Sequence, residues 1–137
     1  MSKAFEEAQK KLYKTFQPVF CPALNEMVYF NADGFSHLLF ENRRPRNANE
    51  RVYRTSLLPY VHSVISNAPT AKEHIKSTTP PVTTWGLDYK LIKTGTNGKL
   101  CKVTVVVIRK KPKGQLTFLS VMCQRKCRPR KKFLGII

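Results

Sequence analysis

The chain has 137 residues, the length of one ordinary domain, so a multidomain enzyme or a long repeat array is not expected. Its residues are 42% hydrophobic, which is enough to bury one core and tells against wholesale disorder. The formal net charge is +17, from 25 Lys and Arg against 8 Asp and Glu. An excess of that size repels itself unless a polyanion or an acidic partner screens it, so composition predicts a basic domain that contacts nucleic acid.

The positive charge is concentrated toward the C-terminus. No Asp or Glu follows Asp88, so every charged side chain from Tyr89 to Ile137 is basic. The first residues lack the apolar core of a signal peptide, and no apolar run approaches the about 18 residues that a membrane span needs. We therefore expect a cytoplasmic protein without a membrane partner, whose basic surface meets phosphate groups.

The first half of the chain predicts helices. Apolar residues at helical spacing indicate helices over residues 2–15, 35–41 and 49–67, the last capped by Asn49 and kinked at Pro59. A short apolar run at 27–30 predicts a strand, and the Pro-interrupted basic segment 42–47 predicts a loop. A helical turn is expected at 71–76. His62, among apolar neighbours of the last helix, is expected to be structural.

The second half predicts an antiparallel meander. Strands are indicated at residues 84–93, 100–110 and 115–124, joined by Gly-containing turns. The fold class is therefore α+β, with N-terminal helices packed on one face of a C-terminal antiparallel sheet and the other face open. Residues 1–124 form one domain, and residues 125–137 form a basic tail.

The register of the last hairpin decides which residues reach the open face. Pairing Lys110 with Gln115 places Ser120 opposite Val105, and Phe118 opposite Val107, on the apolar face. Lys102 and Thr104 then lie on the open face. A one-residue bulge would exchange the faces.

The chemistry that the residues can support is limited. The chain has no Gly-rich phosphate loop, no HExxH and no GxSxG motif, and its four cysteines do not form the two tight ligand pairs of a structural zinc site. His, Arg, Lys, Ser and Thr suit RNA cleavage without a metal, in which a base takes the 2′-hydroxyl proton and cations stabilise the phosphorane. We expect no metal and no cofactor.

Several short segments occur in an order known from a nuclease family. A strand precedes Gly34-Phe35-Ser36-His37-Leu38-Leu39, a basic segment and a helix follow, and strands then carry Tyr89-Lys90, Val103–Ile108 and Phe118-Leu119-Ser120-Val121. Over residues 26–124 this arrangement resembles the barnase, EndoU, colicin and RelE-like (BECR) nuclease fold, in particular its phage-associated branches.

The resemblance implies a set of site residues. His37 would be the general acid or base, Arg43 or Arg44 would bind phosphate, and Lys90 and Ser120 would stabilise the scissile phosphate. The register instead favours Lys102 and Thr104, and both sets are retained. The remaining predicted nucleic-acid contacts are basic residues of the helix connection and the tail: Arg46, Arg125, Lys126, Arg128 and Arg130. An ordinary surface histidine is the alternative for His37.

These patterns together favour one function over two others. We expect a toxin-like endoribonuclease of phage or mobile-element type that cuts tRNA or ribosomal RNA without a metal, and that an acidic antitoxin or immunity protein restrains. The first alternative is a non-catalytic RNA- or DNA-binding protein. The second is an adaptor or inhibitor that occupies the nucleic-acid groove of another protein.

Overall fold

The computed structural model describes residues 3–77, 82–94, 99–110 and 114–123, except for the side chains of 90–94 and 99–101. The helices and strands follow one another along the chain as α1 (Lys3–Lys14), β1 (Val19–Cys21), β2 (Glu26–Tyr29), α2 (Ala32–Leu39), β3 (Phe40–Glu41), β4 (Arg44–Pro45), α3 (Ala48–Thr55), the 3-10 turn η1 (Leu58–Tyr60), α4 (Val61–Asn67), β5 (Ala71–Lys76), β6 (Val82–Thr94), β7 (Lys99–Arg109) and β8 (Leu116–Cys123). The α+β class is confirmed.

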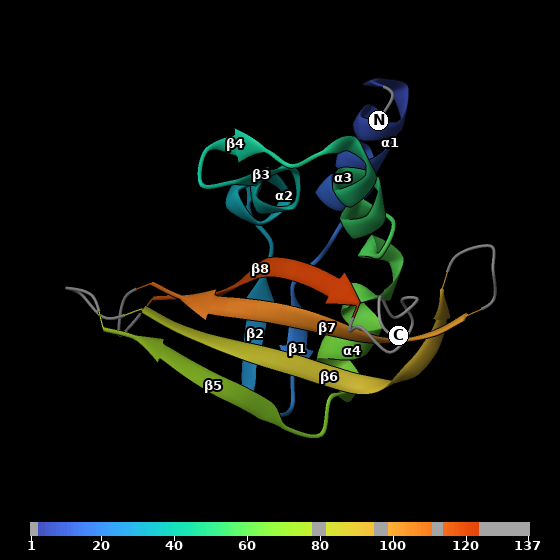
Figure 1. The fold of residues 1–137 in the computed structure, drawn as a ribbon. Helices are drawn as coiled ribbons and strands as arrows, with labels where there is room; N and C mark the ends of the chain where they lie inside the picture. The colour runs from blue at the N-terminus through green and yellow to red at the C-terminus, as the bar shows by residue number, and fades with distance from the viewer. Residues whose placement is uncertain (1–2, 78–81, 95–98, 111–113, 124–137) are drawn as a thin grey trace, which may run out of the picture.

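A curled six-stranded sheet forms the body of the molecule, in the order β1-β2-β8-β7-β6-β5 (Figure 1). Strands β5 to β8 are antiparallel neighbours in chain order, so the predicted meander is confirmed and gains a strand. The helical turn predicted at 71–76 is wrong, because this segment pairs with β6 along its whole length as an edge strand. Pairing with a neighbouring strand outweighed the helix-forming residues of that segment.

The N-terminal strands complete the sheet on its other side. The strand predicted at 27–30 is observed as β2, and the short strand β1, which the sequence did not predict, pairs with it across a turn that holds Asn25 at a φ of 55°. Strand β2 then pairs in parallel with β8 at two positions, Val28 with Leu116 and Tyr29 with Thr117. The sheet is therefore mixed rather than purely antiparallel.

Helices α2 and α3 are capped by asparagines. The side chain of Asn31 accepts a hydrogen bond from the Gly34 N–H at 3.2 Å, so α2 begins at Ala32, three residues before the predicted start. Asn47, rather than the predicted Asn49, caps α3. The single helix predicted for 49–67 is divided into α3, η1 and α4 around Pro59, which is the kind of interruption that proline imposes.

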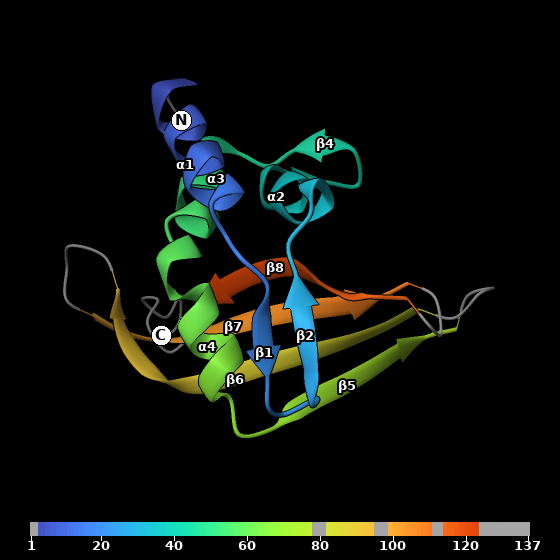
Figure 2. The same ribbon diagram turned by 180° about the vertical axis from the view of Figure 1, so that it is seen from behind.

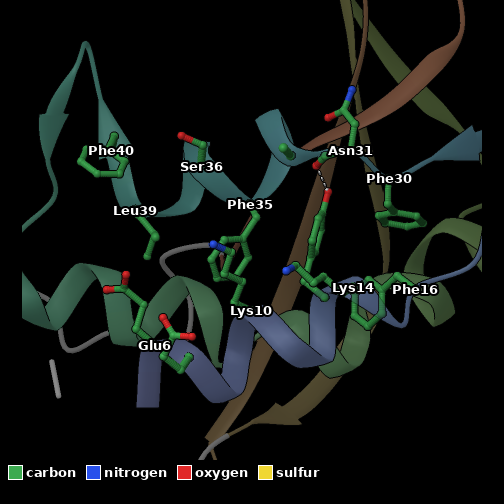
Figure 3. A pocket seen from close by; sticks show the side chains of 13 residues that line it. Glu6, Lys10, Lys14, Phe16, Phe30, Asn31, Phe35, Ser36, Leu39 and Phe40 are labelled. Carbon is green, nitrogen blue, oxygen red and sulfur yellow. Dashed lines mark hydrogen bonds between the residues drawn. The ribbon is translucent and has the colours of Figure 1, made fainter. Parts of the chain in front are cut away.

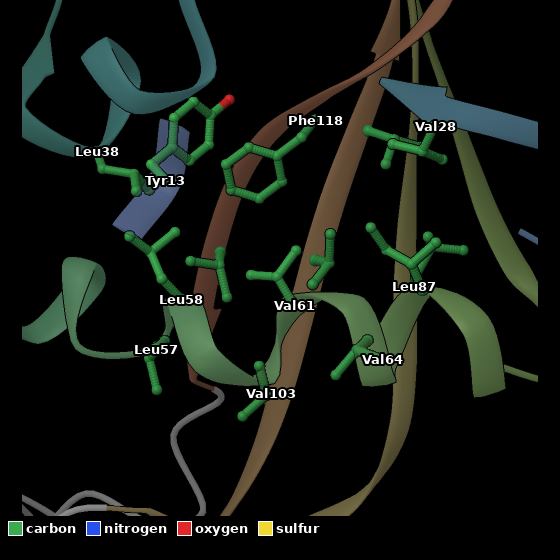
Figure 4. Close-up of a cluster of buried hydrophobic side chains, with 14 of the residues drawn as sticks. Tyr13, Val28, Leu38, Leu57, Leu58, Val61, Val64, Leu87, Val103 and Phe118 are labelled. Carbon is green, nitrogen blue, oxygen red and sulfur yellow. The ribbon is translucent and has the colours of Figure 1, made fainter. Parts of the chain in front are cut away.

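The core lies between the helices and one face of the sheet. Helix α4 crosses this face beside β1, as Figure 2 shows, and its apolar side chains meet those of the central strands (Figure 4). The largest fully buried side chains are Phe118, Leu38, Leu58, Ile65, Leu87, Leu116, Val28, Val61, Val64, Val103, Val105 and Val107. His62 is structural as predicted, since its ring packs against those of Phe16 and Phe30, which also contact each other, and its Nε2 lies 2.8 Å from the Gln17 carbonyl oxygen.

A bulge changes the predicted face of β8. Phe118 pairs with Val107 as predicted, but the register shifts at the next position and Ser120 pairs with Val106. The predicted pairing of Ser120 with Val105 is wrong because Leu119 is the extra residue of the bulge, and Val121 takes the position opposite Val105. Ser120 therefore lies on the same face of the sheet as Val106 and Thr104, and not on the face of Val105.

Beyond Thr117 the edge of β8 is covered by helices instead of by a strand. Gly34 of α2 lies so close that a Cβ there would be 2.7 Å from the carbonyl oxygen of Phe118 and 2.6 Å from the hydroxyl of Tyr13. At the end of the strand, the Tyr53 hydroxyl donates to the Cys123 carbonyl at 3.1 Å and accepts from the Cys123 N–H at 3.0 Å. The Tyr53 hydroxyl thus satisfies both backbone hydrogen-bonding groups of Cys123, as a neighbouring strand would.

None of the helices in the described ranges is long and apolar enough to cross a membrane.

Replacing Gly34 by alanine should destabilise the protein by about 1–3 kcal/mol, because the added methyl group would overlap backbone and ring atoms in a packed interior. Gly86→Ala is the control, since a Cβ there would meet only the Thr104 methyl group, at an ordinary 3.9 Å. Urea unfolding measures both. Equal midpoints for the two variants would contradict the close approach of α2 to β8.

Candidate functional site

A tight hairpin connects α2 to α3, where the sequence predicted a loop. Strands β3 and β4 pair Phe40 with Pro45 and Glu41 with Arg44. The two residues between them, Asn42 and Arg43, have φ values of 51° and 67°, as a two-residue hairpin turn requires. The chain therefore reverses at once and brings Arg46, the residue that follows β4, back to α2.

That arginine, Arg46, closes the C-terminal end of α2. Its backbone N–H donates to the Leu39 carbonyl at 2.8 Å, and its Nε donates to the His37 carbonyl at 3.1 Å. Its Nη1 lies 3.5 Å from Oε1 of the exposed Glu41, and only 7% of its side chain is exposed. A cation at this end of a helix is favoured by the helix dipole and by the carbonyl groups left without helical partners.

A second arginine reaches the same region from α3. Arg54 donates from Nε to Glu50, one helical turn earlier, at 2.8 Å, and from Nη1 to the Ser120 hydroxyl at 2.9 Å. Its side chain is 14% exposed, and Ser120 itself is 2% exposed. Arg54 therefore links α3 to the covered edge of β8.

His37 lies in the last turn of α2, and both arginines affect the pKa of its imidazole. Burial lowers the pKa of its imidazole below the ordinary 6.5, the positive charges of Arg46 and Arg54 lower it further, and Glu41 opposes them. The imidazole is therefore neutral at pH 7 and able to accept a proton. Burial also lowers the pKa of Arg46, with Arg54 acting in the same direction. We call His37, Arg46, Arg54 and Ser120 the His37 cluster.

The structure brings some of the predicted site residues together and leaves others apart. His37, Arg46 and Ser120 belong to the cluster, whereas Arg43 and Arg44 are exposed on the hairpin beyond it. Lys102 and Thr104 lie on β7 and both bind Asp88 of β6, the lysine at 3.6 Å.

The other predicted residues are placed less fully. The backbone of Lys90 lies in β6, where the pairing with β7 shifts between Asp88 and Leu91, and β7 separates it from the strand of Ser120. The side chain of Lys90, and the tail residues Arg125, Lys126, Arg128 and Arg130, lie outside the described part. The set His37, Arg44, Lys90 and Ser120 is therefore not seen as one group.

Sequence reasoning missed Arg54 and the two glutamates that hold the arginines. Glu50 and Arg54 are four residues apart in a helix, which is the spacing of an ordinary surface ion pair. The sequence alone therefore gives no sign that Arg54 reaches β8. Glu41 follows the helix that carries His37, and only the hairpin turns it toward Arg46. Within the described ranges, no three His, Cys, Asp or Glu side chains are grouped as metal ligands.

Comparison of the chain with protein-family models, with curated proteins and with solved structures gives no match. The resemblance to the BECR nucleases thus stays a prediction from short motifs.

Replacing Arg46 by glutamine should raise the pKa of His37 toward 6.5, since a cation that lowers it is removed. An NMR titration of the imidazole measures this. Arg44→Gln, which removes an exposed charge of the same hairpin, should leave the pKa nearly unchanged. The same shift in both variants would show that Arg46 affects the pKa of His37 no more than a distant surface charge does.

The sign of the linked stability effect follows from the lowered pKa. The folded protein binds the His37 proton more weakly than the unfolded chain, so the His37 contribution should reduce stability as the pH falls from 6.5 toward the lower folded value. In Arg46→Gln the pH range between the folded-state pKa of His37 and 6.5 should narrow, so less stability should be lost as the pH falls. Urea unfolding at a series of pH values measures this.

Proposed function

We propose that the protein is a metal-independent endoribonuclease in which the His37 cluster acts on the scissile phosphodiester. The observation that supports this most is the pair of largely buried arginines beside a histidine whose pKa is lowered by burial and by both of them. Neutral imidazole is the form that a general base needs, and adjacent guanidinium groups suit a phosphate that gains negative charge in the transition state.

The reaction proceeds by attack of the ribose on its own 3′-phosphate. His37 takes the 2′-hydroxyl proton, the 2′-oxygen forms a bond to phosphorus, and the bond from phosphorus to the 5′-oxygen breaks. Water supplies the proton to the leaving 5′-oxygen, because the described part of the cluster holds no second histidine. The products are a 2′,3′-cyclic phosphate and a 5′-hydroxyl.

The two arginines have different roles in this scheme. Arg46 is paired with the exposed Glu41 at 3.5 Å, so a phosphate can displace that carboxylate and bind the guanidinium in its place. Arg54 is held by Glu50 and by Ser120 and acts as a positioning residue with a fixed positive charge. Ser120 orients Arg54 instead of contacting the phosphate.

The natural substrate and partner follow from the same chemistry. We propose tRNA or ribosomal RNA in the cytoplasm as the substrate, and a toxin-like role of phage or mobile-element type. An acidic antitoxin or immunity protein would suit a chain of formal charge +17 by charge complementarity.

Non-catalytic nucleic-acid binding is the second candidate function. It is favoured by the ion pairs of Arg46 and Arg54 with glutamates, which are stable without any substrate. In that case the cluster only holds α2 and α3 together, and the exposed lysines and arginines supply all phosphate contacts.

His37→Ala should reduce cleavage of total tRNA and ribosomal RNA at least about a hundredfold, since a general base contributes roughly 10²–10⁴. The assay is run in EDTA, and fragments ending in 2′,3′-cyclic phosphate identify the reaction. RNA affinity should stay within about twofold, because the imidazole is neutral at pH 7 and adds no charge to the interface.

The matched control is His74→Ala, which removes an exposed histidine of β5. It should cleave at the wild-type rate. Intact RNA after long incubation with the wild-type protein would support the binding function instead, and full activity of His37→Ala would remove His37 from the mechanism.

A further inference from the structure

A groove of about 630 Å³ lies between α1 and α2. Figure 3 shows side chains of both helices pointing into it. Its volume is within the roughly 300–1,000 Å³ of pockets that hold small organic groups. None of its lining residues belongs to the His37 cluster, so it is a separate feature of the fold.

The walls of the groove are aromatic. As Figure 3 shows, Phe16 and Phe30 line one end, and Phe40, which is 38% exposed, lines the other. Phe35 and Leu39 form an apolar floor and are buried in the core. An exposed phenylalanine beside a hollow offers a ring face on which a planar group can stack.

The charges at the rim suit an anionic ligand. Lys10 and Lys14 line the groove from successive turns of α1. Glu6 also lines it, but its carboxylate is bound by Arg51 at 2.5 Å, so its charge is compensated. Among the other charged residues that line the groove there are one acid, Glu7, and two lysines. The rim is therefore net positive, and the Ser36 hydroxyl adds a hydrogen-bonding group.

The groove and the His37 cluster lie on different sides of α2 and the segment after it, because consecutive side chains of a helix project about 100° apart and those of a strand point to opposite faces. Ser36 lines the groove and His37 follows it in α2. Phe40 lines the groove, and the next residue, Glu41, pairs with Arg46. An RNA strand that passes around α2 from one side to the other would therefore meet the groove and the cluster at neighbouring positions of the chain.

We propose that the groove between α1 and α2 binds an unpaired base of the RNA substrate, with Phe40 stacking on the base and Lys10 and Lys14 contacting the neighbouring phosphates. This inference rests on the proposed function, since it makes the substrate single-stranded at the cleaved nucleotide. Bases in a duplex are stacked on one another and do not present their faces to a side chain. Stacking on phenylalanine is tolerant of sequence, so the groove selects unpaired over paired RNA rather than one base.

Binding is measured with a short single-stranded RNA whose riboses carry 2′-O-methyl groups, so that no 2′-hydroxyl is present and cleavage cannot occur. Phe40→Ala should weaken binding about tenfold, the loss expected for one stacked base. Phe20→Ala, which removes a 46% exposed phenylalanine of β1 outside the groove, should change affinity less than twofold. Binding of an abasic strand of equal length should be the same in both variants.

Lys14→Gln tests the rim with the same probes. It should weaken binding of the base-bearing and abasic strands alike and reduce the slope of log affinity against log salt by about one, as loss of one phosphate contact does. Lys72→Gln, an exposed lysine of β5, is its control and should leave the slope unchanged.

The proposal is overturned if Phe40→Ala binds the single strand as tightly as Phe20→Ala, or if it loses as much affinity for the abasic strand. Its failure is distinct from failure of the proposed function, because the methylated probe requires no catalysis. An inactive His37→Ala together with unchanged binding by Phe40→Ala would reject the groove alone. A fully active His37→Ala with weakened binding by Phe40→Ala would reject the catalytic role of His37 and retain the groove.

Discussion

The edge of β8 beyond Thr117 is the constraint on which the rest of the structure depends. Strand β2 pairs with β8 only as far as Thr117, and the bulge at Leu119 bends the strand from that point. The backbone groups of such an edge need partners. Helix α2 comes within reach because residue 34 has no side chain, and α3 supplies Tyr53 for Cys123 and Arg54 for Ser120. Covering one strand edge thus fixes both helices that carry the His37 cluster.

The cluster follows from this arrangement and from the short hairpin between α2 and α3. A two-residue turn leaves Arg46 at the end of α2, where helix carbonyls and Glu41 hold it, while Arg54 is fixed on the neighbouring helix. Two guanidinium groups near one another are costly unless anions separate them. Glu41 and Glu50 meet that need in the free protein, and in the proposed reaction a phosphate would take the place of Glu41. The positive charges that favour an anion also lower the pKa of His37, together with burial, and so keep its imidazole neutral. A neutral imidazole is the form that the proposed general base requires.

The sequence predicted the features that depend on local pattern. Apolar runs located β6, β7 and β8, and the place of His37 in a helix and the structural role of His62 followed from the apolar residues around them. It failed where a non-local partner decides. Residues 71–76 became a strand because β6 lies beside them, and Ser120 changed face because of a single extra residue in β8. Arg46 was expected to contact phosphate, but its neighbour in the cluster, Arg54, was invisible because a Glu50–Arg54 pair has the spacing of any solvated helix.

The distribution of ion pairs explains how a chain of charge +17 keeps a fold and still has cations for a ligand. Six of the carboxylates, Glu6, Glu26, Asp33, Glu41, Glu50 and Asp88, are paired with a basic side chain within the described ranges. Most of these pairs join different elements, such as α1 with α3 and β2 with β7. Pairs at the surface contribute little stability each, but they place positive charges at defined positions. Because six of the eight acids are paired with basic side chains of the fold, the excess positive charge is carried by exposed residues such as Lys10, Lys14 and Arg44. In the proposed function these exposed cations would guide a polyanion to α2, where the aromatic groove would take a base and the His37 cluster a phosphate.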